Sequence, residues 1–201
     1  MQRVRDPFAE ALCAIRRHVR AGRYVRGERL AIADLAQELD LSATPVREAL
    51  ARLAGEGLIE ERRGQGYFAW RPDVVDLTEL YELQGAYLGF ALARAGGRLE
   101  LDAAVGGPHD GGEALFAQIV RQSNSAALAR ANRLLADRLA APRLAEAQVL
   151  DNLSQEFEDL LASHRADRLG AALAAYHKRR IGMGQAIIAA LRSFASEALE
   201  I

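Results

Sequence analysis

A β-hairpin pattern that directly follows three amphipathic helical patterns restricts the fold of this chain more than any other feature. All four patterns lie within the first 72 residues, and the third helical one lies in "LSATPVREALARL", residues 41–53. Val46, Ala49, Leu50 and Leu53 are spaced at i, i+3, i+4 and i+7, the spacing of one apolar face of an α-helix. The sequence therefore predicts a helix here whose other face is polar.

The start of this helix is predicted from Thr44 and Pro45. Threonine is a common N-cap, and the first helical position tolerates proline best. Arg47 and Arg52 lie off the apolar face and are expected to be exposed. The helix should therefore carry positive charge on its polar face, close to its N-terminus.

Two further helices are predicted before it. In "RDPFAEALCAIRRHVRAG", Asp6 is a candidate N-cap, Pro7 the first helical residue and Gly22 the C-terminal stop of a helix of about four turns. After the extended connector "YVRGERL", the segment "IADLAQELDLS" predicts a short helix that buries Leu35 and Leu39. The short turn between this helix and the next is typical of a helix-turn-helix.

The segment "GLIEERRGQGYFAW" predicts two strands, residues 58–62 and 67–70, joined by the turn "RGQG". Gly64 and Gly66 permit the positive φ angles that such a turn needs, and Arg62 and Arg63 are placed at its tip. Three helices followed by a hairpin predict a winged helix-turn-helix.

A winged helix presents groups that suit DNA. The N-terminal N–H groups of the third helix attract phosphate, and that helix fits the major groove. The wing offers arginine and a close glycine backbone to the sugar-phosphate. The DNA-binding residues predicted in this way are Ser42, Thr44, Pro45, Arg47, Arg52, Arg62, Arg63, Gly64, Gln65 and Gly66. Winged helices also serve as protein-interaction modules, so the pattern alone leaves that alternative open.

The distribution of charge modestly favours the N-terminal part as the partner of an anion. The whole chain has a net charge of −1, but residues 1–73 hold 13 arginines and 11 acidic residues. Cys13 is the single cysteine, so no disulfide can form within the chain, which is typical of a reducing compartment. Neither a signal-peptide pattern nor an 18-residue apolar run is present, so we expect a cytoplasmic protein with no membrane partner.

The stretch "LSATPVREALARLAGEGLIEERRGQGYFA" resembles the GntR superfamily of bacterial transcription regulators, because TPVREAL, EGLI and a G-x-G wing occur in the family's order. The resemblance covers roughly residues 10–70 and implies binding of double-stranded operator DNA. Ala43 stands where relatives usually carry arginine, and Ala33 where they carry arginine or another polar residue. Because a lost arginine contact costs about 1–3 kcal/mol, we expect a weaker or altered operator site.

Residues 73–201 are predicted to form a separate all-α domain of about six helices, following the DNA-binding domain of residues 1–72. Asp76 and Glu79 are a candidate capping pair for its first, long helix. The glycine-rich segment 96–112 is expected to be a loop, and helix breaks are expected at residues 141–142 and 165–166. The run "YHKRR", residues 176–180, is expected to be a solvated helix face.

This bundle resembles the FadR-type effector domain called FCD, which commonly binds a divalent metal through one aspartate and three histidines. The family's pattern puts Leu128, Asn132, Phe157 and His177 at these four positions. One imidazole and one amide cannot form a tight site for a transition metal, which needs at least three good donors. We therefore expect no metal and no other cofactor.

The same resemblance implies where an effector would bind. Gln84 and Leu88 align with an Arg-x-x-x-Glu pattern of the first bundle helix. The predicted effector pocket therefore consists of Gln84, Leu88, Leu128, Asn132, Phe157 and His177. Its leucines and phenylalanine favour an effector more apolar than the family's usual carboxylates, or a pocket filled by side chains.

Taken with the resemblance, the sequence predicts a homodimeric transcription regulator, specifically a ligand-responsive repressor with a metal-free C-terminal pocket. Two alternatives are a metal-dependent carboxylate sensor and a ligand-independent DNA-binding or protein-interaction module. An enzyme is not expected, because no nucleophile–base pair, paired carboxylates or phosphate loop stands out in the sequence.

Overall fold

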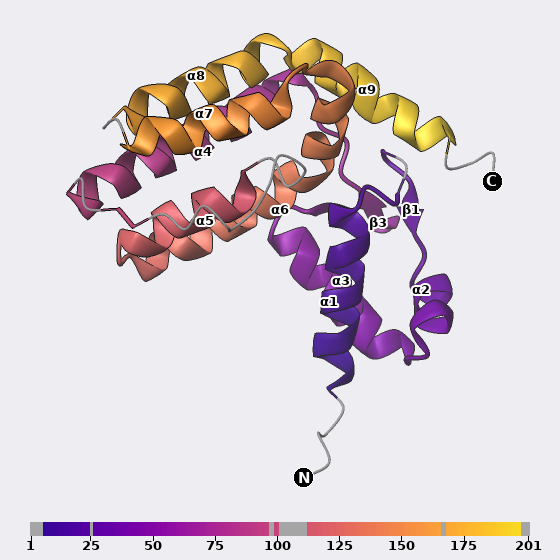
Figure 1. The fold of residues 1–201 in the computed structure, drawn as a ribbon. Coiled ribbons are helices and arrows are strands. Elements are labelled where there is room, and N and C mark those ends of the chain that lie inside the picture. The colour runs from indigo at the N-terminus through magenta and orange to yellow at the C-terminus, as the bar shows by residue number, and fades with distance from the viewer. Residues whose placement is uncertain (1–5, 25, 97–98, 101–111, 166–167, 198–201) are drawn as a thin grey trace. The chain divides into compact units, whose positions relative to one another are not determined.

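The fold consists of two compact units in a computed structural model (Figure 1) that describes residues 6–24, 26–96, 99–100, 112–165 and 168–197. Residues 1–71 and the segment from Arg192 onward form the first unit, and residues 72–191 form the second. Most of the predicted loop at 96–112 lies outside the described residues. None of the described helices is both long and apolar enough to cross a membrane.

The N-terminal unit is a winged helix-turn-helix, as predicted. Its elements in chain order are α1 (Pro7–Arg20), β1 (Arg29–Leu30), α2 (Ile32–Leu39), α3 (Ala43–Gly55), β2 (Ile59–Arg62) and β3 (Gly66–Ala69). Its core is built from all three helices and the sheet and contains Ala11, Ile15, Leu30, Leu35, Val46, Ala49, Leu50, Leu53, Leu58, Ile59 and Tyr67. The i, i+3, i+4, i+7 face of α3 is thus fully buried.

The N-caps of the unit are only partly as predicted. The Asp6 carboxylate accepts hydrogen bonds from the N–H groups of Phe8 and Ala9, both at 3.1 Å, as the sequence indicated. The cap of α3 is Ser42 and not Thr44, which makes Pro45 the third helical residue. Proline is tolerated there because the N–H groups of a first turn have no helical acceptor to lose.

The wing belongs to a three-stranded antiparallel sheet of order β1-β3-β2, whereas the sequence predicted only a two-stranded hairpin. The missed strand, β1, has two residues, which is too short for an alternating pattern to reveal. The wing strands also start at Ile59 and Gly66, one residue away from the predicted positions. At the turn, the Gln65 N–H donates to the Arg62 carbonyl at 2.8 Å, and Gly64 has a φ of +75°.

The second unit is helical, as predicted. The described part contains α4 (Val74–Ala95), α5 (Glu113–Gln122), α6 (Ala126–Val149), α7 (Leu153–Arg165), α8 (Leu169–Gly182) and α9 (Gly184–Glu197), whose last residues group with the first unit. The capping box of α4 pairs Asp73 with Asp76, each side chain accepting from the other's N–H at 2.9 Å. The predicted pair of Asp76 and Glu79 is therefore wrong by one turn.

The predicted break at residues 141–142 is also wrong, because α6 continues through Pro142. Proline removes one helical hydrogen bond, a cost of about 3 kcal/mol. Pro142 and its neighbours Leu139, Ala140, Arg143 and Ala145 are all buried, so packing on both sides of the proline offsets this cost. A break that the sequence did not indicate occurs at Met183, between α8 and α9.

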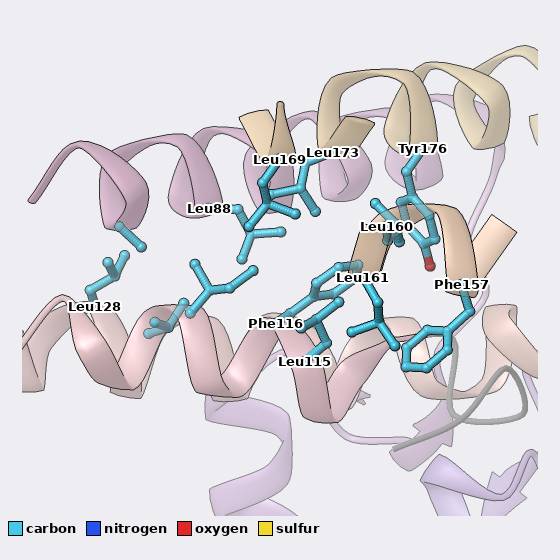
Figure 2. Close-up of a cluster of buried hydrophobic side chains, with 13 residues drawn as sticks. Leu88, Leu115, Phe116, Leu128, Phe157, Leu160, Leu161, Leu169, Leu173 and Tyr176 are labelled. Carbon is cyan, nitrogen blue, oxygen red and sulfur yellow. The ribbon is translucent and has the colours of Figure 1, made fainter. Parts of the chain in front are cut away.

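The apolar core of the helical unit lies between α4, α5, α6, α7 and α8 (Figure 2). It contains Leu88, Ala91, Leu115, Phe116, Ile119, Val120, Leu128, Phe157, Leu160, Leu161, Leu169, Leu173 and Tyr176. Three of these, Leu88, Leu128 and Phe157, are residues of the predicted effector pocket. They pack against other apolar side chains in the unit's interior.

Candidate functional site

The first turn of α3 is exposed and has no side-chain cap. Ser42 makes no capping hydrogen bond, in contrast to Asp6 of α1 and Asp73 of α4. Ser42, Ala43 and Thr44 are all exposed. Because N–H groups at a helix start lack helical acceptors and carry partial positive charge, this turn can bind an anion.

Arg47 adds a full positive charge one turn further along α3. Its side chain is exposed, and no ion pair to it occurs among the described residues. Burial raises the pKa of the Tyr67 phenol on β3, and the nearby Glu61 raises it further. The charge of Arg47 is close enough to oppose this shift in part. The start of α3 and the wing therefore lie within electrostatic reach of each other.

Arg52, by contrast, is neutralised. Its Nε donates to Glu56 Oε1 at 2.7 Å, and Glu56 also pairs with Arg16 of α1 at 2.7 Å. Arg52 lies in the last turn of α3, away from the uncapped start. It is thus part of an ion-pair cluster that joins α1 to the end of α3.

The two arginines predicted at the wing tip differ in their surroundings. Arg63 is exposed in the turn, next to Gly64 and Gln65. Arg62 instead folds back on its own strand, donating to Glu60 Oε2 at 2.9 and 3.2 Å, with its guanidinium 4.1 Å from the centre of the Phe68 ring. Only Arg63 is therefore directed to solvent from the turn itself.

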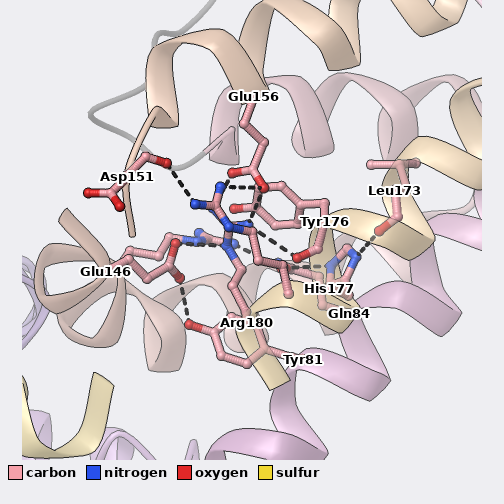
Figure 3. A network of polar contacts seen from close by, with 11 residues as sticks. Tyr81, Gln84, Glu146, Asp151, Glu156, Leu173, Tyr176, His177 and Arg180 are labelled. Carbon is pink, nitrogen blue, oxygen red and sulfur yellow. Dashed lines mark hydrogen bonds and ion pairs between the residues drawn. The ribbon is translucent and has the colours of Figure 1, made fainter. Parts of the chain in front are cut away.

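A buried polar network occupies the centre of the helical unit (Figure 3). Arg180 of α8 is 1% exposed, and its Nε donates to Glu146 Oε2 of α6 at 2.8 Å. Its terminal nitrogens donate to both carboxylate oxygens of Glu156 in α7, at 2.9 and 3.1 Å, and its guanidinium lies 3.3 Å from the centre of the Tyr176 ring. Tyr81 of α4 donates to the other oxygen of Glu146, Oε1, at 2.5 Å. The network around Arg180 therefore links α4, α6, α7 and α8.

The network continues towards α5 through a second buried cation. Arg143 Nη2 donates to Gln84 Oε1 at 3.0 Å, and Arg143 Nη1 pairs with Glu113 at 3.3 Å. His177 Nδ1 lies 2.7 Å from the Leu173 carbonyl, and His177 Nε2 lies 3.3 Å from Gln84 Oε1 (Figure 3). Gln84 and His177, two predicted pocket residues, are thus brought together inside this network.

Burial sets the protonation state of these groups. The pKa of His177 falls to about 4, mainly because burial disfavours the charged ring, and the neighbouring charges of Arg180 and Arg143 lower it further. The neutral ring donates from Nδ1 to the Leu173 carbonyl. Burial and the nearby Glu146 carboxylate raise the pKa of Tyr81 well above its usual value, so this phenol keeps its proton.

The last predicted pocket residue, Asn132, is 5% exposed on α6. Its Oδ1 and the Nε2 of Gln84 are both buried, and neither has a hydrogen-bond partner among the residues that the structure describes.

The four residues that the sequence resemblance aligns with a metal site offer few donor atoms. Leu128 and Phe157 offer no donor atom, which leaves His177 Nε2 and the amide of Asn132. Within the described part of the chain, no group of three or more histidine, cysteine, aspartate or glutamate residues is arranged to hold a metal ion.

A groove of about 680 Å³ lies between α5 and α6. Alanines form much of its lining, among them Ala114, Ala117 and Ala129, and Arg121 and Arg133 contribute positive charge. Its volume is in the range of small-molecule sites. Asn132 is the predicted pocket residue that also contributes to this groove.

Sequence reasoning missed most of the buried network. The run "YHKRR" was expected to be a solvated helix face, but Tyr176, His177 and Arg180 are buried, whereas Lys178 is exposed. The signal was present in the spacing, because Leu169, Leu173, Tyr176, His177 and Arg180 recur at i, i+4, i+7, i+8 and i+11. Arg180 thus continues the apolar face of α8.

Comparisons with known proteins match both units. Residues 8–68 match the family described as bacterial regulatory proteins, gntR family. The chain is 36% identical over 74 residues to an uncharacterized HTH-type transcriptional regulator of Mycobacterium tuberculosis, a match that covers 37% of this chain and 30% of that protein. It is 43% identical over 58 residues to the Nta operon transcriptional regulator of Aminobacter aminovorans, covering 29% and 28%. The chain thus spans about 30% of the length of these relatives.

Two solved structures share the fold over nearly the whole chain. E. coli McbR/YncC has a TM-score of 0.63 at 20% identity, covering 90% of this chain and 98% of that one. A protein from Rhodococcus sp. RHA1 described as a GntR transcriptional regulator has a TM-score of 0.58 at 19% identity, covering 96% and 97%. At such identities the likeness concerns the fold alone.

Proposed function

We propose that this chain is a transcription regulator that binds double-stranded operator DNA, because its residues 8–68 match the family of bacterial regulatory proteins called gntR. The observation that carries the proposal is the uncapped, exposed first turn of α3, followed by the exposed Arg47. In this proposal the first turn binds backbone phosphate, α3 enters the major groove, and Arg63 with the wing glycines contacts the neighbouring backbone.

Replacing Arg47 with alanine tests the proposal. A duplex enriched from random-sequence DNA by the wild-type protein serves as the probe, and fluorescence anisotropy measures affinity at several salt concentrations. Arg47→Ala should weaken binding by about 1–3 kcal/mol or reduce the salt slope by about one. Arg130→Ala, which removes an exposed arginine from α6, is the matched control. Wild-type affinity and salt slope in Arg47→Ala would refute this role of α3.

We propose in addition that the protein acts as a homodimeric repressor. Two winged helices related by a two-fold axis would read two half-sites of a pseudo-palindromic operator, which a single copy cannot do. Sedimentation of the protein with and without the duplex measures the stoichiometry. Two chains per duplex would support the proposal, and one chain per duplex would contradict it.

For the helical unit we propose regulation by a small molecule without any bound metal. The donor set at His177 and Asn132 is too poor for a transition metal, and the groove between α5 and α6 is large enough for an effector. Metal analysis of protein purified without added metal should give well under one equivalent per chain. A thermal-shift screen should find apolar ligands that raise the melting temperature of wild type but not of an Ala117→Trp variant, which narrows the groove.

The packed interior favours a second candidate, a ligand-independent regulator. Leu88, Leu128 and Phe157 belong to the apolar core, and Gln84 and His177 are engaged within the polar network. In that case no compound in the screen would change either the melting temperature or the DNA affinity. A compound that changes both would exclude this candidate.

A further inference from the structure

The outer face of the wing sheet carries two arginines whose surroundings differ sharply. In the register of the sheet, Arg29 of β1 lies opposite Phe68 of β3, and Phe68 lies opposite Glu60 of β2. Arg62 pairs with Gly66 in the same register, two residues closer to the turn. Because side chains alternate between the two faces of a sheet, these five residues share one face.

Arg62 is the nearer of the two to the turn, but its guanidinium is directed away from it. It stacks on Phe68 and binds Glu60 Oε2, and the other oxygen of Glu60 accepts the Arg71 N–H at 3.2 Å. Both carboxylate oxygens are thus engaged, which fixes Glu60 in place. The positive charge of Arg62 is compensated where it lies.

Arg29 starts farther from the turn and reaches towards it. Its Nε and Nη2 lie 3.8 and 4.0 Å from the place where a Cβ on Gly66 would be. The guanidinium of Arg29 therefore lies beside Gly66, whose φ is +106°, at the start of β3. Arg29 is exposed, and it forms no ion pair with any residue that the structure describes.

We propose that Arg29, together with Arg63, binds a DNA phosphate at the wing. In the same proposal the ion pair with Glu60 keeps Arg62 from binding the DNA. The proposal rests on the DNA-binding function proposed above. An exposed guanidinium without a counter-charge gains a full ion pair with a phosphate and releases a counterion from the DNA. Arg62 would first have to leave Glu60 and the Phe68 ring, so its gain is smaller.

The test compares two charge-removing variants with the wild-type protein on the selected duplex and on a random-sequence duplex. Arg29→Gln removes the positive charge and keeps a polar side chain at this position. It should bind both duplexes about 5- to 10-fold more weakly, with a salt slope smaller by about one, because a phosphate contact carries no sequence information. Wild-type affinity and slope in Arg29→Gln would overturn the assignment.

Glu60→Gln tests the second half of the proposal. Freeing Arg62 should strengthen binding several-fold and steepen the salt slope by about one. The gain should disappear in the double variant Glu60→Gln/Arg62→Ala; a gain that persists there, or no gain at all, would overturn the role of Glu60. Circular dichroism verifies that each variant is folded.

These outcomes separate the inference from the proposed function. If the wild-type protein enriches no duplex, the proposed function fails. If wild type binds, Arg47→Ala binds weakly and Arg29→Gln binds like wild type, the inference alone fails.

Discussion

Replacing Arg180 with methionine should destabilise the helical unit severely. The guanidinium is 1% exposed and donates to Glu146 and Glu156 at 2.8–3.1 Å (Figure 3). Its removal leaves the buried Glu146 carboxylate with the hydrogen bond from the Tyr81 hydroxyl but without a counter-charge from Arg180. Removing one member of a buried ion pair costs about 3–5 kcal/mol, because the other charge stays desolvated and unpaired. Methionine keeps most of the side-chain volume, so little of this loss comes from a cavity.

The neighbouring residue provides a matched control. Arg179 is one position away on α8, pairs with Glu156 at 3.3 Å and donates to the Asp151 carbonyl, but its side chain is 36% exposed. Solvent screens such a pair, so Arg179→Met should cost less than about 1 kcal/mol. The two substitutions make the same chemical change at different depths.

Urea unfolding followed by circular dichroism at 222 nm measures both effects, and fluorescence of Trp70, the single tryptophan, follows the N-terminal unit separately. Adding Glu146→Gln to Arg180→Met should recover at least about 1 kcal/mol, because it removes the unpaired charge. The reasoning would be refuted if Arg180→Met lost no more stability than Arg179→Met, or if the double variant were less stable than Arg180→Met.

Three further predictions concern protonation, DNA affinity and capping. The pKa of His177 is lowered from 6.5 to about 4, so the unfolded chain takes up a proton first as the pH falls. The free energy of unfolding should therefore drop by up to roughly 3 kcal/mol between pH 6.5 and 4. Urea unfolding at several pH values measures this drop, which should be smaller by that amount in His177→Gln. Ala43→Arg, at the exposed start of α3, should tighten binding to the selected duplex at least about fivefold by anisotropy, and no gain would contradict the view that Ala43 has lost a DNA contact. Asp73→Ala removes the capping box of α4 and should cost about 1 kcal/mol in thermal unfolding, while a cost near zero would mean that the cap contributes nothing.

The N-terminal unit was predictable from the sequence because its signals are local. The apolar residues at helical spacing in α3 indicate a helix, and Gly64 and Gly66 indicate a turn, without reference to distant residues. The fold follows from the order of these elements along the chain. The two-residue strand β1 escaped because it exists only through its pairing with β3. The cap of α3 was misplaced because Ser42 and Thr44 are both acceptable N-caps, and sequence alone does not decide between them.

The centre of the helical unit was not predictable in the same way. Arginine and glutamate on a helix are normally solvated, so the position of Arg180 on the apolar face of α8 did not by itself predict a buried charge. The glutamates that pair with it lie on other helices, Glu146 on α6 and Glu156 on α7. Pro142 was interpreted as a break because its intrinsic cost is known, whereas the packing that offsets this cost comes from other helices. All six predicted pocket residues are buried, three of them apolar and three polar, and their role as an effector pocket stays a prediction.

Selection of duplexes from random-sequence DNA by the wild-type protein tests the central claim most directly. Two copies of α3 in successive major grooves on one face of the DNA predict enrichment of an inverted repeat, with half-site centres about one helical turn apart. A pool in which no sequence is enriched over the input after repeated rounds would contradict the claim that this protein reads operator DNA.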